Sequence, residues 1–198
     1  MKIVLPLNCE ATYEAGFLTT EEALQLYQHL INHYQINQAF LRMQFPDKEY
    51  ISDFGKISFT SQQWINQNYF PEQGYGKCFV WDDMMLDVKT KVESYYQVAF
   101  GICVCIYYPD GNTGVDFHSD LRAFGDLDVI PSISLGAERQ FLLRSKDTQE
   151  EFDILLENGS ILIMGKNCQE RYEHALPLAP DCQSGRINLT FRKVDSKK

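Results

Sequence analysis

The hydrophobic positions in the first half of the chain follow a helical period in two segments. Leu24, Tyr27 and Leu30 recur at three-residue intervals, which places their side chains on one face of an α-helix. Thr19 and Glu22 have the spacing of a capping box, in which each side chain hydrogen-bonds to the backbone N–H of the other residue. The pattern therefore predicts a helix that begins after Thr19 and packs one face against a core.

A second helix is predicted to begin at Asp82–Asp83, because Met85, Val88 and Val92 follow at helical spacing. Between the two predicted helices, residues 36–81 look like short strands and loops and contain 11 of the 26 aromatic residues. We expect most of these rings to form a small aromatic core. The alternative is a flap whose exposed rings hold a flat substrate between them.

From Ala99 onward the pattern changes to that of β-strands. Phe100–Tyr108 is an apolar, β-branched and aromatic run that ends at the turn sequence Pro109-Asp110-Gly111-Asn112. Further strand-like segments span residues 131–136, 139–144, 151–156, 160–164, 171–176 and 186–193. Asn158–Gly159 between two of these segments predicts a hairpin turn. Many short strands without helices between them indicate a double-sheet barrel or sandwich with the two helices packed outside.

Composition places the chain among soluble globular proteins. It has 198 residues, of which 44% are hydrophobic and 23% charged, and this length suits one domain. It contains no apolar run long enough to span a bilayer, and Met1–Pro6 lacks the long apolar stretch of a secretory signal. We therefore expect a cytoplasmic location, no membrane partner and, by default, a monomer. The six cysteines form no Cys-x-x-Cys pair and are interpreted as reduced packing residues.

Candidate metal ligands occur at His118, Asp120 and His174. Side chains alternate between the two faces of a strand, so the imidazole and the carboxylate of His118-x-Asp120 are expected to point the same way. The other two histidines, His29 and His33, lie on the first predicted helix, which leaves His174 as the candidate third ligand. Two histidines and one carboxylate can occupy one face of a ferrous ion and leave positions open for a co-substrate and dioxygen.

The last predicted strand alternates polar and apolar residues. Its apolar residues can seal the core, so the polar residues Arg186, Asn188, Thr190 and Arg192 must face either a cavity or solvent. Guanidinium groups bind carboxylates through paired hydrogen bonds. If the polar face lines a cavity, that cavity suits a dicarboxylate.

Four groups of residues occur together in the second half of the chain. They are Tyr108-Pro-Asp-Gly111, His118-x-Asp120, Ser132-x-Ser134-Leu135-Gly136, and His174 followed by Arg186-x-Asn188-x-Thr190-Phe191-Arg192. In this order they resemble the AlkB-like iron(II)/2-oxoglutarate dioxygenases over residues 100–193. The last motif is a highly specific signature of that family, whereas residues 1–99 match only in layout.

The resemblance implies a mainly β, α+β fold: a double-stranded β-helix, or jelly roll, with N-terminal helices packed outside. All 198 residues would form a single dioxygenase domain. Residues 1–98 would supply the helices and an aromatic-rich substrate lid, and residues 99–198 the catalytic jelly-roll core.

The resemblance also implies a role for each candidate site residue. His118, Asp120 and His174 would bind Fe(II) as the catalytic centre. Arg186, helped by Tyr108 and Asn188, would bind the far carboxylate of 2-oxoglutarate, and Arg192 the carboxylate nearest the metal. Dioxygen and 2-oxoglutarate would then give succinate and carbon dioxide while a substrate C–H bond is hydroxylated. An N-methyl group so hydroxylated leaves as formaldehyde.

Two departures from the family pattern affect the expected binding of 2-oxoglutarate and of the substrate, and so does the net charge of the chain. Ile106 stands where many members have an asparagine, which predicts weaker 2-oxoglutarate binding. Leu121 and Arg122 stand where nucleic-acid repair members often have another carboxylate. The formal net charge of −9 also argues against long-range attraction to nucleic acid, since affinity for phosphates normally requires a basic surface.

Three functions are therefore compared. The expected function is oxidative dealkylation of N-alkylated bases in DNA or RNA, as in the repair of alkylation damage. The first alternative is an AlkB-like oxygenase that acts on a methylated protein side chain or a small molecule. The second is a jelly-roll binding module without catalysis.

Overall fold

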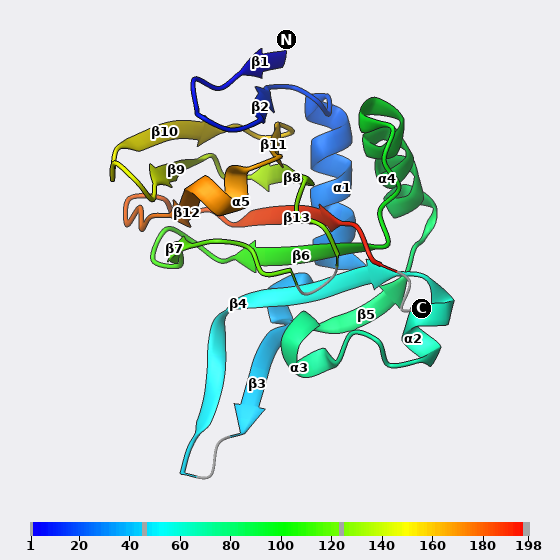
Figure 1. Ribbon diagram of the computed structural model, residues 1–198. Helices are drawn as coiled ribbons and strands as arrows, with labels where there is room; N and C mark the ends of the chain where they lie inside the picture. Colours follow the sequence, from blue (N-terminus) through cyan, green and yellow to red (C-terminus); the bar gives the residue numbers. More distant parts are fainter. Residues whose placement is uncertain (1, 45–46, 123–124, 196–198) are drawn as a thin grey trace.

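The computed structural model describes residues 2–44, 47–122 and 125–195, which form two β-sheets with helices packed against the larger one (Figure 1). The strands are β1 Lys2–Val4, β2 Ala11–Glu14, β3 Phe40–Gln44, β4 Glu49–Thr60, β5 Lys77–Val80, β6 Ile102–Tyr108, β7 Val115–His118, β8 Val129–Gly136, β9 Arg139–Ser145, β10 Glu151–Leu156, β11 Ile161–Gly165, β12 Tyr172–Leu176 and β13 Arg186–Arg192. The helices are α1 Thr20–Asn32, α2 Gln62–Asn66, α3 Glu72–Tyr75, α4 Asp83–Tyr96 and α5 Cys168–Arg171, with a short 3-10 helix η1 Ile36–Gln38.

The two sheets enclose a common interior. Hydrogen-bonded strands of the larger sheet follow the order β1-β2-β11-β8-β13-β6-β4-β3, with β5 pairing parallel to β4, and the smaller sheet follows β10-β9-β12-β7. Ile130 of β8 and Leu162 of β11 in the larger sheet belong to one buried cluster with Leu143 of β9 in the smaller sheet. The fold is the mainly β jelly roll that the sequence predicted, and apolar side chains fill one part of its interior.

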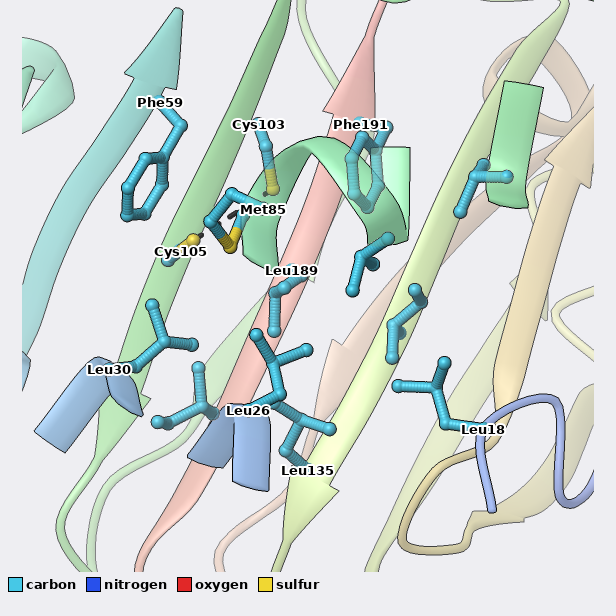
Figure 2. Packing of buried hydrophobic residues seen from close by; sticks show 14 of the residues in the cluster. Leu18, Leu26, Leu30, Phe59, Met85, Cys103, Cys105, Leu135, Leu189 and Phe191 are labelled. Atoms are coloured by element: carbon cyan, nitrogen blue, oxygen red, sulfur yellow. Dashed lines mark hydrogen bonds between the residues drawn. The ribbon is translucent and has the colours of Figure 1, made fainter. Parts of the chain in front are cut away.

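The main hydrophobic core lies on the other face of the larger sheet, under α1 and α4 (Figure 1). Figure 2 shows Leu26 and Leu30 of α1 and Met85 of α4 packed toward Leu189 and Phe191 of β13, and all five are at most 1% exposed. Burial of these side chains against the sheet holds both helices in place. None of the described helices is long and apolar enough to cross a membrane.

The predicted starts of both long helices are confirmed. Thr19 and Glu22 form the complete capping box of α1, and the Asp82 side chain accepts a hydrogen bond from the Met85 backbone N–H at the start of α4. Leu24 was expected on the buried face of α1 but is 52% exposed. The buried face of α1 instead consists of Ala23, Leu26 and Leu30.

The predicted hairpin at Asn158–Gly159 is wrong. A turn occurs there, with Gly159 at a φ of +78°, but β10 before it pairs with β9 and β11 after it pairs with β2 and β8. The turn therefore carries the chain from the smaller sheet to the larger one. A hairpin and a crossing between sheets can use the same turn residues. The sequence could therefore not distinguish the two.

The aromatic residues of 36–81 mostly pack on one another, as expected. Trp64, Tyr69, Phe70 and Tyr75 form a chain of ring contacts over the end of β6. The rings of Phe59, Phe79 and Trp81 join the main core instead. The hairpin of β3 and the first part of β4 projects away from the rest of the molecule (Figure 1).

Candidate metal and co-substrate site

The two candidate histidine ligands face each other across a strand pair. His118 ends β7, and His174 of β12 is its direct antiparallel partner. Directly opposed residues of antiparallel strands project from the same face of the sheet, and the two imidazole centroids are 4.3 Å apart. The Asp120 carboxylate completes the group, because one ligand atom from each of the three residues lies within 4.8 Å of the others. This spacing suits a single metal ion.

Asp120 is placed by a loop rather than by strand alternation. The strand β7 ends at His118, so the expected alternation does not extend to the carboxylate. The Asp120 backbone N–H instead donates to Oε1 of Gln169 at 2.8 Å, and the Ser119 hydroxyl donates to the Tyr172 carbonyl at 3.0 Å. These bonds attach the loop to α5 and to β12. His174 also lies on β12.

Both imidazoles can offer a lone pair to a metal. Nδ1 of His118 lies 2.8 Å from the Asp116 carbonyl oxygen; donation to this oxygen leaves Nε2 as the free acceptor, the arrangement that usually orients a metal-binding histidine. His174 is 6% exposed. Burial lowers its pKa to about 4, although Asp120 opposes the shift, so His174 is neutral at physiological pH. A histidine must be neutral to bind a metal.

A cavity of about 270 Å³ adjoins the three candidate ligands. Strands β6, β8 and β13 of the larger sheet supply its polar wall. Strands of both sheets, including β4, supply its apolar wall. The polar residues are Tyr108, Ser132, Arg186, Asn188 and Thr190, and the apolar residues are Phe54, Ile106, Val115, Phe141, Met164 and Leu176. Three of the four polar residues of the last strand, Arg186, Asn188 and Thr190, therefore face a cavity and not solvent.

Arg186 is a buried cation without a carboxylate partner in the described part of the chain. It is 2% exposed, and its Nη2 donates to Oγ of Ser134 at 3.0 Å and to Oδ1 of Asn188 at 3.1 Å, both neutral acceptors. Within the described residues its buried Nε has no hydrogen-bond partner. Burial lowers the pKa of Arg186 to about 10, so it stays charged at neutral pH. An isolated buried charge is unfavourable, and an anionic ligand would neutralise it.

A ladder of side-chain hydrogen bonds fixes the amide of Asn188 beside this guanidinium. Oδ1 of Asn188 accepts from the Ser132 hydroxyl at 2.7 Å as well as from Arg186, and Nδ2 donates to Oγ1 of Thr190 at 2.8 Å. The Tyr108 ring lies 5.5 Å from the Arg186 guanidinium carbon. Tyr108, Asn188 and Arg186 are therefore brought together as the sequence indicated.

Arg192 and Ile106 do not belong to this polar wall. Arg192 does not line the cavity: its Nη2 donates to the Leu121 carbonyl at 2.8 Å, and its Nη1 lies 3.7 Å from the Asp120 carboxylate. It is thus placed beside a candidate metal ligand, and its expected contact with a co-substrate stays a prediction. Ile106 is the register partner of Asn188 and lines the cavity, so an apolar wall stands where the family pattern has an amide.

Sequence reasoning did not identify Gln169, Phe54 or Arg139. Gln169 lies on a four-residue helix that shows no periodicity in the sequence. Phe54 is one of eleven rings in its region, and nothing in their spacing separates it from the others. Arg139 is 2% exposed and donates to the carbonyls of Asp110, Thr113 and Pro177, which are distant in sequence. Only the tertiary structure shows these contacts.

Replacing Gln169 with leucine tests whether it positions Asp120. Gln169 is 7% exposed, and a leucine side chain at its position would leave the Asp120 N–H without its acceptor. We expect the apparent affinity for Fe(II), measured anaerobically, to fall about 10- to 100-fold, as for other outer-shell partners of metal ligands. The control is Gln25→Leu on the exposed face of α1. Equal affinity in Gln169→Leu and Gln25→Leu would show that Gln169 does not position the carboxylate.

The chain matches one protein family and is similar to several known proteins. The model of the 2OG-Fe(II) oxygenase superfamily matches residues 10–192. The alpha-ketoglutarate-dependent dioxygenase alkB homolog 3 of Mus musculus is 33% identical over 124 residues, covering 58% of this chain and 43% of that protein. The DNA oxidative demethylase ALKBH2 of Mus musculus is 30% identical over 123 residues, covering 58% and 52%.

Among solved structures, a prolyl hydroxylase from Trichoplax adhaerens in complex with a hypoxia inducible factor peptide fragment shares the fold. Its TM-score is 0.62 at 14% identity, covering 93% of this chain and 83% of that one. The match covers about half the length of each of the two mouse relatives.

Proposed function

Because the chain belongs to the 2OG-Fe(II) oxygenase superfamily and is AlkB-like, we propose that it is an iron(II)- and 2-oxoglutarate-dependent dioxygenase that removes N-alkyl groups from nucleic-acid bases. The observation that carries the proposal is the buried Arg186 guanidinium, which lines the same cavity as His118, Asp120 and His174. A cation that has no carboxylate partner among the described residues, beside three candidate metal ligands, fits an anionic co-substrate that also binds the metal.

The donor set suits Fe(II). Two imidazoles and one carboxylate on one side of an ion match the facial arrangement of non-haem iron oxygenases and leave positions open. When bound, iron with 2-oxoglutarate supplies the oxidation of a substrate C–H bond by dioxygen. The chain's own task is to orient His118 through the Asp116 carbonyl, to hold Asp120 through Gln169, and to keep His174 buried and neutral.

The polar wall suits 2-oxoglutarate. Arg186 would pair with the carboxylate far from the metal, and Asn188 would keep the guanidinium oriented through its bond to Nη2. Ile106 and Leu176 on the apolar wall would exclude water from the carbon chain of the co-substrate. Arg192 would act on the other side of the metal, by holding Asp120 and the Leu121 carbonyl in place.

The size of the cavity restricts what can enter it. A volume of about 270 Å³ lies below the range of pockets that enclose a drug-sized ligand, which begins at about 300 Å³. With 2-oxoglutarate inside, only a small part of a substrate could reach the metal ligands. A substrate that inserts one alkylated group fits this space. The name of one mouse relative, DNA oxidative demethylase, supports a nucleic-acid base as the carrier of that group.

Phe54 is the aromatic residue of 36–81 that lines the cavity in the described structure. We infer that its ring contacts the alkylated base. Phe54→Ala should lower kcat/KM for a methylated oligonucleotide by about 5- to 150-fold, equivalent to the roughly 1–3 kcal/mol of one base–aromatic contact. The KM for 2-oxoglutarate should stay unchanged.

Phe54→Tyr is the matched control, because it keeps a flat ring and should retain most of the activity. If Phe54→Ala and Phe54→Tyr turned over the oligonucleotide equally well, the ring would have no role in substrate binding.

Succinate release measured with different substrates tests the proposed function. We expect stimulation by oligonucleotides that contain 1-methyladenine or 3-methylcytosine, with release of formaldehyde, and no stimulation by the unmodified strand. Stimulation by a methylated peptide alone would identify an oxygenase that acts on protein. Absence of succinate with every substrate, together with intact ligand binding, would identify a binding module.

A further inference from the structure

Two cysteines lie near each other where the loop between β1 and β2 packs against α5, and neither lines the cavity. Cys9 lies in that loop, and Cys168 is the first residue of α5. Cys168 belongs to the buried cluster between the sheets, and Cys9 packs against that cluster. The Cys168 thiol donates to the carbonyl of Glu10 at 3.3 Å, so it lies against the residue that follows Cys9.

The backbone on both sides of this pair is already fixed. The Glu10 N–H donates to the Lys166 carbonyl at 3.1 Å, and the Gly165 N–H donates to the Glu10 carbonyl at 2.6 Å. On the other side, Arg171 donates to the Asn8 carbonyl at 3.0 Å. A bond between the two sulfur atoms would therefore join segments that already lie side by side.

The two thiols differ in reactivity. A hydrogen bond with the Cys168 side chain, together with the positive charge of Arg171, lowers the pKa of Cys9 against the opposing effect of burial. The same hydrogen bond and burial raise the pKa of Cys168. Cys9 is also partly exposed, whereas Cys168 is buried. Cys9 thus has the properties of an attacking thiolate, and Cys168 those of a resolving thiol beside it.

A second close pair in the structure lacks these properties. The sulfur atoms of Cys103 and Cys105 are 3.8 Å apart on β6, but both residues are 0% exposed. Burial raises the pKa of Cys103. An oxidant in solution does not reach this pair in the folded protein, so proximity alone does not make a reactive site.

We propose that Cys9 and Cys168 are a modification site at which a hydroperoxide forms a reversible intramolecular disulfide. The Cys9 thiolate attacks one peroxide oxygen, giving Cys9 sulfenic acid and, from hydrogen peroxide, a first water after protonation. The Cys168 thiol then attacks the sulfenic sulfur, the S–S bond forms, and a second water leaves. Two thiols are oxidised and one peroxide is reduced, and a dithiol reductant reverses the reaction.

The bond would attach the amino-terminal segment to the helix that holds Asp120. Cys168 precedes Gln169, which accepts the Asp120 N–H, and a link between residues so far apart restricts almost the whole unfolded chain. We expect the oxidised protein to unfold at a Tm higher by roughly 5–15 °C than the reduced protein. This result does not depend on the proposed oxygenase function, because it is measured without iron, 2-oxoglutarate or substrate.

The test treats the full, reduced chain with stoichiometric hydrogen peroxide in the presence of a metal chelator, followed by peptide mapping under non-reducing conditions. We expect a cross-linked peptide that joins Cys9 to Cys168, the loss of two free thiols, and recovery of both with dithiothreitol. The Tm should rise with oxidation and return on reduction.

Three variants complete the test. Cys182→Ser removes another partly exposed thiol and should keep both the cross-link and the rise in Tm. Cys9→Ser should lose both, and Cys9→Ala provides a second test of the same position. A Cys9 that stays unlinked, or that accumulates as sulfinic acid, would overturn the proposal, as would an equal rise of Tm in Cys9→Ser.

Discussion

The Arg186→Met variant is expected to lose 2-oxoglutarate binding while the protein stays folded. Breaking a buried charge pair by removing one partner costs about 3–5 kcal/mol, so the KM for 2-oxoglutarate should rise between about 10² and 10⁴-fold. In the ligand-free protein, however, Arg186 is a 2% exposed cation whose hydrogen-bond acceptors are the neutral side chains of Ser134 and Asn188. Replacement by an apolar side chain removes the cost of burying that charge, so the Tm should not fall. The succinate assay measures the expected rise in KM for 2-oxoglutarate, and calorimetry measures the expected unchanged Tm.

Arg139→Met is the matched control for this variant. Arg139 is equally buried, but it donates to three backbone carbonyls, those of Asp110, Thr113 and Pro177. Its loss leaves these acceptors unpaired at about 1–3 kcal/mol each, so its Tm should fall. A variant Arg186→Met that binds 2-oxoglutarate as tightly as the unaltered protein would exclude Arg186 as the carboxylate-binding residue.

The His174→Ala variant is expected to lose Fe(II) binding and with it all measurable succinate formation. His174 is the buried member of the three candidate ligands and the direct strand partner of His118. Loss of one of three ligands should exceed the effect of outer-shell partners, so the affinity for iron should fall by more than about 100-fold. Isothermal titration under anaerobic conditions and the succinate assay measure the two losses.

His33→Ala controls for the loss of an imidazole elsewhere in the protein. His33 lies at the end of α1, stacked on His29 with ring centroids 5.2 Å apart, and it does not line the cavity. This variant should bind iron normally. Equal iron affinity in His33→Ala and His174→Ala would remove His174 from the site.

The sequence predicted those parts of the molecule in which chemistry and local pattern coincide. Polar and charged side chains are costly to bury without a partner or ligand. The sequence shows such side chains in the His118-x-Asp120 pair and in the alternation from Arg186 to Arg192. The structure places all of them around one cavity except for Arg192. The capping residues Thr19 and Asp82 fixed the helix starts because a cap acts within one helical turn.

The remaining features depend on contacts between distant segments. Gln169 reaches Asp120 across 49 residues, and the turn at Gly159 crosses between sheets, because β11 pairs with β2 and β8 rather than with β10. Phe54 differs from the other described rings of residues 36–81 in that it lines the cavity. Contacts between segments far apart in the chain set each of these features, and no local sequence pattern specifies such contacts.

Anaerobic titration of the protein with Fe(II) and 2-oxoglutarate tests the central claim most directly, because a metal-to-ligand charge-transfer band in the visible range requires the co-substrate to bind the iron itself. The band should appear only when both are present, saturate at one iron per chain, disappear in His174→Ala, and require far more 2-oxoglutarate in Arg186→Met. No band at saturating concentrations, or a band that His174→Ala leaves unchanged, would contradict an iron centre built from His118, Asp120 and His174.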